Sequence, residues 1–110
     1  MNLAKAKLLE SKGWVVGDAG DFLGLSDEER RFVELKLSLA HGVKELRERL
    51  GLTQMALAEK LGSSQSRVAK MEAGDRSVSL DLTMRSVLSM GATTTEIAKW
   101  IRRAEGRRAA

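Results

Sequence analysis

The sequence contains no cysteine and no proline among its 110 residues. The lack of cysteine excludes a disulfide framework, a thiolate nucleophile and a cysteine-ligated zinc site, and it suits a reducing compartment. The ten glycines are spread along the chain. Because glycine is favoured just past helix ends, this distribution without proline predicts several helices separated by glycine turns.

Long apolar runs are also missing. No segment approaches the roughly 18 apolar residues that would span a bilayer. The first residues, MNLAKAKLLESKGWV, lack the continuous apolar stretch and the small-residue cleavage site of a signal peptide. We therefore expect a soluble cytoplasmic protein with no membrane segment.

Length and composition indicate one globular domain. Of the residues, 43% are hydrophobic and 31% are charged, and the net charge is +4. A chain of this length normally forms a single core. A positive charge permits a polyanionic partner, because neutralising phosphates releases counterions, but it does not establish one.

The first long helix is predicted from about Ser26 to Leu50. Ser26 and Glu29 have the spacing of a capping box, in which the two residues bond reciprocally to each other's backbone amides. Apolar residues then recur every three or four positions along one stripe: Phe32, Leu35, Leu39, Val43, Leu46 and Leu50. A second stripe contains Val33, Leu37 and Ala40, so either the N-terminal segment or a second subunit should cover it. Gly42 is the alternative: it would break the helix there.

Residues 51–74, GLTQMALAEKLGSSQSRVAKMEAG, have a spacing that is unusual for a helical hairpin. Thr53 can cap one short helix, which Gly62 ends, and Ser64 can cap another only two residues later. Two short helices joined so tightly must cross steeply, which is the geometry of a helix-turn-helix over residues 53–72. Its inward residues are predicted to be Leu57, Ala58, Leu61, Val68 and Met71.

These residues resemble the Xre-type, or lambda-repressor/Cro, helix-turn-helix proteins over roughly residues 43–92. LRERLGLTQ before the motif, and EAGDRSVSLDL leading into a helix over 80–90 capped by Ser79, also match that family. The sequence departs from the family at Ser63, Thr83 and Ser86, where apolar residues are more usual. The resemblance implies an all-α fold, a compact bundle of about five short helices with a lambda-repressor-like helix-turn-helix and an extra N-terminal helical segment.

The outward face of the second motif helix follows from its inward residues. With Val68 and Met71 inside, the 100° helical step turns Ser66 and Lys70 outward and puts Gln65, Arg67 and Ala69 on the flanks. Glutamine pairs well with adenine, lysine or arginine with guanine, and serine with either. The resemblance puts the base-reading positions at Ser64, Gln65, Ser66 and Lys70.

Phosphate contacts are expected near helix ends, where free amides and the positive end of the helix dipole attract anions. Gln54 and Arg76 are the candidates for phosphate, and Arg67 could contact either bases or phosphates. The alternative for each of these side chains is that it is an ordinary solvent-exposed residue without a ligand. Together they indicate double-stranded DNA as the partner.

Nothing in the sequence indicates catalysis or a cofactor. The single histidine, His41, lies inside a predicted helix with no second ligand type arranged near it, so we expect a structural or surface role. No nucleophile elbow, phosphate-binding glycine loop or carboxylate-rich metal loop occurs. We therefore expect no metal, no cofactor and no enzyme activity.

The predicted organisation has three parts. Residues 1–25 form an N-terminal extension that packs on the core or on a partner, 26–104 form the helix-turn-helix domain, and 105–110 form a mobile basic tail. A last helix over 94–104 groups Ile97, Trp100 and Ile101, and it either covers the core or makes a dimer contact. We expect a homodimer, because one recognition helix covers only half of a palindromic operator.

Three functions remain open at this point. The first is a sequence-specific transcriptional repressor, without a separate sensor domain in so short a chain. The second is an antitoxin resembling the HigA type, which would neutralise a ribonuclease toxin through residues 1–25 and regulate its own operon. The third is a protein-interaction module that has lost DNA binding, against which Gln65, Arg67 and Lys70 argue.

Overall fold

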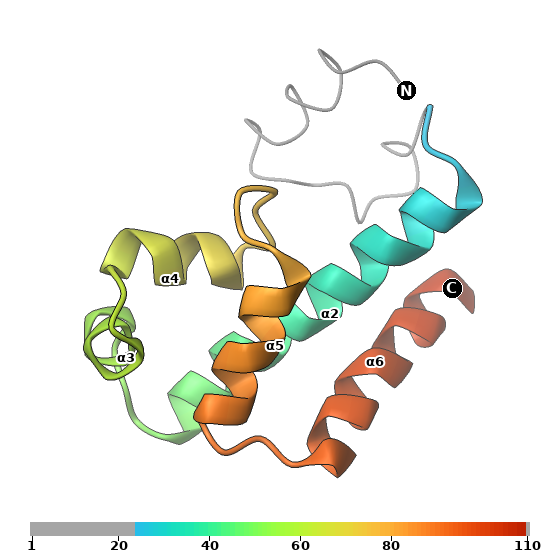
Figure 1. The fold of residues 1–110 in the computed structure, drawn as a ribbon. Helices are drawn as coiled ribbons and strands as arrows, with labels where there is room; N and C mark the ends of the chain where they lie inside the picture. The colour runs from blue at the N-terminus through green and yellow to red at the C-terminus, as the bar shows by residue number, and fades with distance from the viewer. Residues whose placement is uncertain (1–23, 110) are drawn as a thin grey trace.

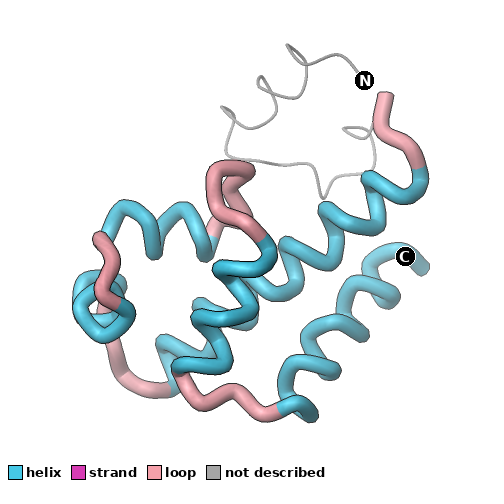
Figure 2. The backbone as a smooth tube through the Cα atoms, viewed as in Figure 1, coloured by secondary structure: helices cyan, strands magenta, loops and turns pink. Residues whose placement is uncertain are grey.

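The computed structural model describes residues 24–109, and these residues form five helices without a strand (Figures 1 and 2). In chain order they are α2 (Asp27–Arg49), α3 (Gln54–Leu61), α4 (Gln65–Glu72), α5 (Leu80–Ser89) and α6 (Thr94–Ala109). The all-α prediction is confirmed, although α2 and α6, with 23 and 16 residues, are not short. The predicted N-terminal extension lies, except for its last two residues, outside the described part of the chain.

A serine or threonine hydroxyl caps the start of each of the five helices, and the sequence predicted four of these caps. Ser26 accepts from the Glu29 amide at 3.1 Å, and the Glu29 carboxylate accepts from the Ser26 amide at 2.9 Å, so the capping box is complete. Thr53, Ser64 and Ser79 cap α3, α4 and α5 by accepting from the amide three residues later. Such caps satisfy backbone amides that no helical carbonyl reaches.

Helix α2 is the long element against which α4, α5 and α6 pack (Figure 1). The core holds Leu39, Val43 and Leu46 from the predicted stripe, each at most 2% exposed. The ends of that stripe are different, since Phe32 is 49% exposed and Leu50 is 43% exposed. The middle of α2 therefore supplies the apolar surface on which the helix-turn-helix is mounted.

The predicted break at Gly42 is wrong. Helix α2 runs through this position without interruption. A Cβ atom at Gly42 would lie 2.4 Å from Cδ2 and 2.5 Å from Cε3 of Trp100, which comes from α6. Gly42 therefore provides room for the indole ring to lie against the backbone of α2.

The second apolar stripe needs no partner subunit. Ala40 is 1% exposed and Leu37 is 9% exposed, and both approach Gly74 in the loop after α4. Ile97 and Trp100 are likewise buried within the chain, at 9% and 3% exposure. The apolar surface that suggested a dimer is thus largely buried within the monomer.

Helix α6 extends beyond its predicted end at residue 104. It continues to Ala109, so residues 105–109 belong to the helix and not to a separate tail. Ion pairs with α2 flank its apolar contact: Arg49 with Glu96 at 2.6 Å and Arg103 with Glu45 at 2.7 Å. Hydrogen bonds from these arginines lower the pKa of Glu96 and of Glu45.

Within residues 24–109, no helix has both the length and the apolar character needed to cross a membrane.

The contact between Gly42 and Trp100 allows a matched test of packing. Gly42→Ala should lower the free energy of unfolding by about 1 to 3 kcal/mol, because overpacking outweighs the gain in helix propensity of about 1 kcal/mol. Gly106→Ala is the control, since a Cβ atom there meets nothing within 4 Å. It should be neutral or slightly stabilising. Denaturant unfolding measures both, and equal effects at the two positions would contradict the packing role of Gly42.

Candidate nucleic-acid interface

Helices α3 and α4 form the predicted helix-turn-helix. The turn depends on Gly62, which has φ 66° and ψ 37°, a left-handed conformation that glycine adopts without strain. The amide of Ser63 then donates to the carbonyl of Ala58 at 2.8 Å and closes the end of α3. Ser64 caps α4 by accepting from the Arg67 amide at 3.1 Å. Only Ser63 and Ser64 therefore separate the αL glycine from the first residue of α4.

The inward face of the motif agrees with the sequence prediction. Leu57 and Val68 are fully buried, and Ala58 and Met71 are 3% and 2% exposed. The small Ala58 leaves room for the close crossing of the two helices. Leu61 is only partly buried but packs against the same core. The orientation of α4 is thus determined by anchors at both of its turns.

The departures from the usual family pattern are accommodated locally. Thr83 is 1% exposed, and its hydroxyl donates to the carbonyl of Ser79 at 3.2 Å within α5. Ser63 is exposed, so a polar residue after the turn costs no burial.

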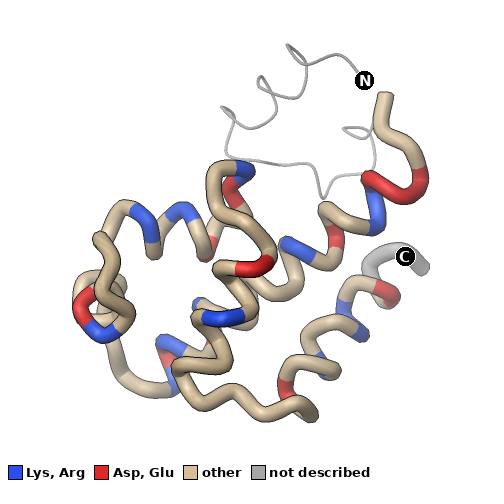
Figure 3. Tube along the Cα trace, viewed as in Figure 1, with Lys and Arg blue, Asp and Glu red and all other residues tan. Residues whose placement is uncertain are grey.

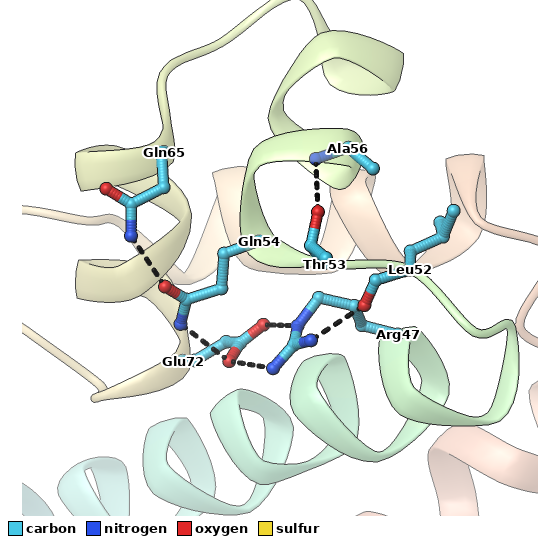
Figure 4. A network of polar contacts seen from close by, with 7 residues as sticks. All are labelled: Arg47, Leu52, Thr53, Gln54, Ala56, Gln65 and Glu72. Atoms are coloured by element: carbon cyan, nitrogen blue, oxygen red, sulfur yellow. Dashed lines mark hydrogen bonds and ion pairs between the residues drawn. The ribbon is translucent and has the colours of Figure 1, made fainter.

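A polar network connects α2 with both helices of the motif (Figure 4). Arg47 donates from Nε to Oε2 of Glu72 at 2.6 Å and from Nη2 to Oε1 at 3.1 Å. Its Nη1 donates to the carbonyl of Leu52 at 2.8 Å. The hydrogen bonds with Glu72 raise the pKa of Arg47. A planar guanidinium that binds a carboxylate through two nitrogens fixes both distance and orientation.

The same network reaches the outer side of the motif through two glutamines. Gln54 donates from Nε2 to Oε1 of Glu72 at 3.1 Å, and its Oε1 accepts from Nε2 of Gln65 at 2.7 Å. Figure 4 shows this sequence of contacts from Arg47 to Gln65. Gln65 is therefore held in position by Gln54 before any ligand arrives.

All five sequence-predicted residues at the start and on the outer side of α4 are exposed to solvent: Ser64, Gln65, Ser66, Arg67 and Lys70. Ser66 and Lys70 lie opposite the buried Val68 and Met71, and Gln65 and Arg67 lie on the flanks of this surface. Ser64, Ser66, Arg67 and Lys70 also line a hollow of about 240 Å³, together with Ser77 and Val78 from the next loop. Side chains of α4 and of the loop after it therefore share one surface.

The two predicted phosphate contacts lie in different surroundings. Arg76 is exposed in the loop between α4 and α5. Gln54 is partly buried at the start of α3, and its amide already bonds to Glu72 and Gln65. The structure thus gives Gln54 a role in positioning Gln65, while phosphate contact by Gln54 stays a prediction.

The loop that carries Arg76 is shaped by Asp75. Oδ1 of Asp75 accepts from the amide of Ser77 at 2.8 Å and from its hydroxyl at 2.6 Å. These bonds lower the pKa of Asp75, and the charges of Lys70 and Lys36 lower it further. The contribution of these bonds to stability is present at neutral pH and disappears as the pH falls through the lowered pKa.

Basic side chains collect around this surface. Figure 3 shows them on α4 and at the tip of the loop between α4 and α5. Arg67 and Lys70 belong to α4, and Arg76 belongs to the loop. A cluster of this kind attracts the negatively charged DNA backbone.

Sequence reasoning missed Arg47 and Glu72. These residues are 25 positions apart, and no helical or turn periodicity relates them. They lie in LRERLGLTQ and EAG, two segments that carry the family resemblance, but their pairing requires the three-dimensional arrangement. Glu72 is also buried at the C-terminal end of α4, where the helix dipole disfavours a carboxylate.

Comparison with known proteins agrees with this geometry. The family model described as Helix-turn-helix matches residues 43–82, which extend from the last two turns of α2 into the start of α5. No curated protein and no solved structure matches the chain significantly. Residues 43–82 therefore match an Xre/lambda-repressor-type helix-turn-helix, which supports a function as a DNA-binding transcription regulator.

Proposed function

We propose that the protein is a transcriptional repressor that reads a specific double-stranded DNA sequence by inserting α4 into the major groove. The observation that carries this proposal is the exposed surface of α4, on which Lys70 lies opposite the buried Val68 and Met71 and Gln65 lies on the flank. An α-helix fits the major groove, and these side-chain types match the donor and acceptor groups of adenine and guanine. A bound repressor would act by occupying the operator, at the nucleoid in the cytoplasm.

Within this proposal the residues have distinct roles. Ser64, Gln65, Ser66 and Lys70 face the bases, and Arg67 contacts either a base or a phosphate. Gln54 and Arg76 face the phosphates on either side of the groove. Gln65 is pre-oriented by its hydrogen bond to Gln54, so less side-chain freedom is given up when it pairs with a base.

The proposed assembly on DNA is a homodimer on a palindromic operator. Helix α4 has eight residues, so a single copy covers only a half-site. Two copies related by a twofold axis would read two half-sites about one helical turn apart. Sedimentation equilibrium with and without operator DNA measures this. A strictly monomeric mass at tens of micromolar protein in both conditions would contradict a dimer.

The described residues do not favour the alternative function as an antitoxin. That interpretation depended on residues 1–25 as a surface for a toxin, and residues 1–23 lie outside the described part of the chain. The DNA-binding surface on α4 is common to both functions. Selection of bound sequences from a random DNA pool is the direct test of the proposed one, and failure to enrich any sequence would contradict it.

The proposed groove binding predicts a strong salt dependence. The logarithm of affinity should fall with the logarithm of salt concentration, with a slope of about −0.9 for each phosphate contacted. Arg76→Gln should make this slope shallower by about one unit for each phosphate that the arginine binds. Arg102→Gln is the control, because Arg102 is exposed on α6, on the other side of the bundle from α4 (Figure 1). Fluorescence anisotropy at several salt concentrations gives the slopes, and a flat response of the unmodified protein is the result that this proposal forbids.

A further inference from the structure

A second hollow, of about 240 Å³, lies between the end of α3, α4 and α5. We call it the α3/α5 groove, and its lining residues are Lys60, Leu61, Ser63, Met71, Leu82, Arg85, Ser86 and Ser89. None of these residues lines the hollow beside the outer face of α4. The two hollows are therefore separate features of the surface.

The floor of the α3/α5 groove is mainly apolar and includes one serine. Met71 is 2% exposed, and Leu61 and Leu82 are partly buried against the core. Ser86, which is 5% exposed, adds a polar side chain to this lining. The groove thus offers an apolar surface beside polar side chains.

Two cations line the groove, and no carboxylate among the described residues lines it. Arg85 uses its Nε to donate to Asp81 at 3.0 Å, which leaves its terminal nitrogens available as donors. Lys60 is exposed and makes no ion pair with any residue between 24 and 109. A guanidinium and an ammonium beside an apolar floor favour a ligand that combines a carboxylate with an aliphatic group.

We infer that the α3/α5 groove binds an acidic segment of a partner protein, with an aliphatic side chain on the floor and a neighbouring carboxylate between Lys60 and Arg85. The apolar floor favours such a segment over a DNA phosphate, because a phosphate gains nothing from apolar contact. Since the groove shares no lining residue with the hollow beside α4, a partner can bind while α4 occupies DNA. The inference goes beyond the proposed repressor function and does not depend on it.

The test uses the blocked peptide acetyl-Gly-Asp-Leu-Asp-Gly-amide and ¹H–¹⁵N spectra of the full chain. The peptide should shift the amide signals of Ser63, Ser86 and Ser89 saturably, with a Kd of about 1 mM for so small a ligand. The same peptide with asparagine in place of both aspartates should bind roughly tenfold more weakly, because it cannot form the charge-assisted hydrogen bonds. Titration in the presence of selected operator DNA should give the same Kd.

Variants then assign the binding to the groove. Lys60→Gln combined with Arg85→Gln should weaken the peptide roughly tenfold, while Lys44→Gln, at an exposed position of α2 outside the groove, should leave it unchanged. No saturable shifts, equal binding of the asparagine peptide, or unchanged binding by the double variant would each overturn the inference. So would a loss of DNA affinity with a shallower salt slope in the double variant, because the groove would then be a phosphate site. None of these results bears on base reading by α4, which the Gln65 and Lys70 variants test separately.

Discussion

Glu72→Ala is expected to lower the free energy of unfolding by about 3 to 5 kcal/mol, the cost of removing one partner of a buried ion pair. The side chains of Arg47 and Glu72 are only 12% and 5% exposed. Without Glu72, the Arg47 guanidinium keeps one protein acceptor among the contacts of this network, the carbonyl of Leu52. The change also removes the acceptor of Gln54, so the start of α3 loses its link to α4.

Glu45→Ala is the matched control for this prediction. Glu45 also forms a two-nitrogen contact with an arginine, Arg103, at 2.7 and 3.3 Å. Here the side chains are 41% and 48% exposed for Arg103 and Glu45, so the loss should stay below about 1 kcal/mol. Urea unfolding measures both variants. Losses of similar size in the two would contradict a specific structural role of the buried network.

The combined variant Gln65→Ala and Lys70→Ala is expected to lose about 2 to 6 kcal/mol of affinity for the selected operator, because each base contact contributes about 1 to 3 kcal/mol. The corresponding change in Kd is roughly 30-fold to 20,000-fold. Both side chains are exposed, so the fold should persist and thermal unfolding should be nearly unchanged.

Lys44→Ala combined with Lys99→Ala is the control for charge. It removes two positive charges, whereas the α4 double variant removes one, and both lysines are exposed on other helices, α2 and α6. If nonspecific attraction dominated, this control would lose more affinity than the α4 variant. That result would refute α4 as the reading element, whereas a small loss supports it.

Features that depend on residues three or four apart were predictable from the sequence. The caps at Ser26, Thr53, Ser64 and Ser79 are local, because each hydroxyl bonds to an amide three residues later. The turn at Gly62 is local in the same sense. The helix-turn-helix could therefore be located to within a residue or two.

Features that depend on distant residues were not predictable in this way. The residues around Gly42 suggest that it breaks the helix. Its presence in α2 is explained only by the close approach of Trp100, which lies 58 positions later in the sequence. The apolar second stripe was assigned to the N-terminal segment or to a second subunit, because no local rule brings Leu37 and Ala40 to Gly74.

The candidate site also combines features that depend on nearby residues with features that depend on distant ones. The exposed face of α4 follows from helical periodicity, so Gln65, Ser66 and Lys70 were predictable. The support behind that face was not, because Glu72 meets Arg47 and Gln54 across 25 and 18 positions of sequence. Gln54 was expected at a phosphate, and its hydrogen bonds show that it also holds Gln65.

The most direct test of base reading by α4 is the affinity of single variants for the selected operator and for every single-base change within it. Base contacts carry sequence information, whereas phosphate contacts mainly position the protein. Gln65→Ala and Lys70→Ala should each relax discrimination at particular base pairs, and Arg76→Ala should weaken binding to all sequences about equally. If Gln65→Ala and Lys70→Ala remain folded and leave both affinity and base preference unchanged, α4 is not the reading helix.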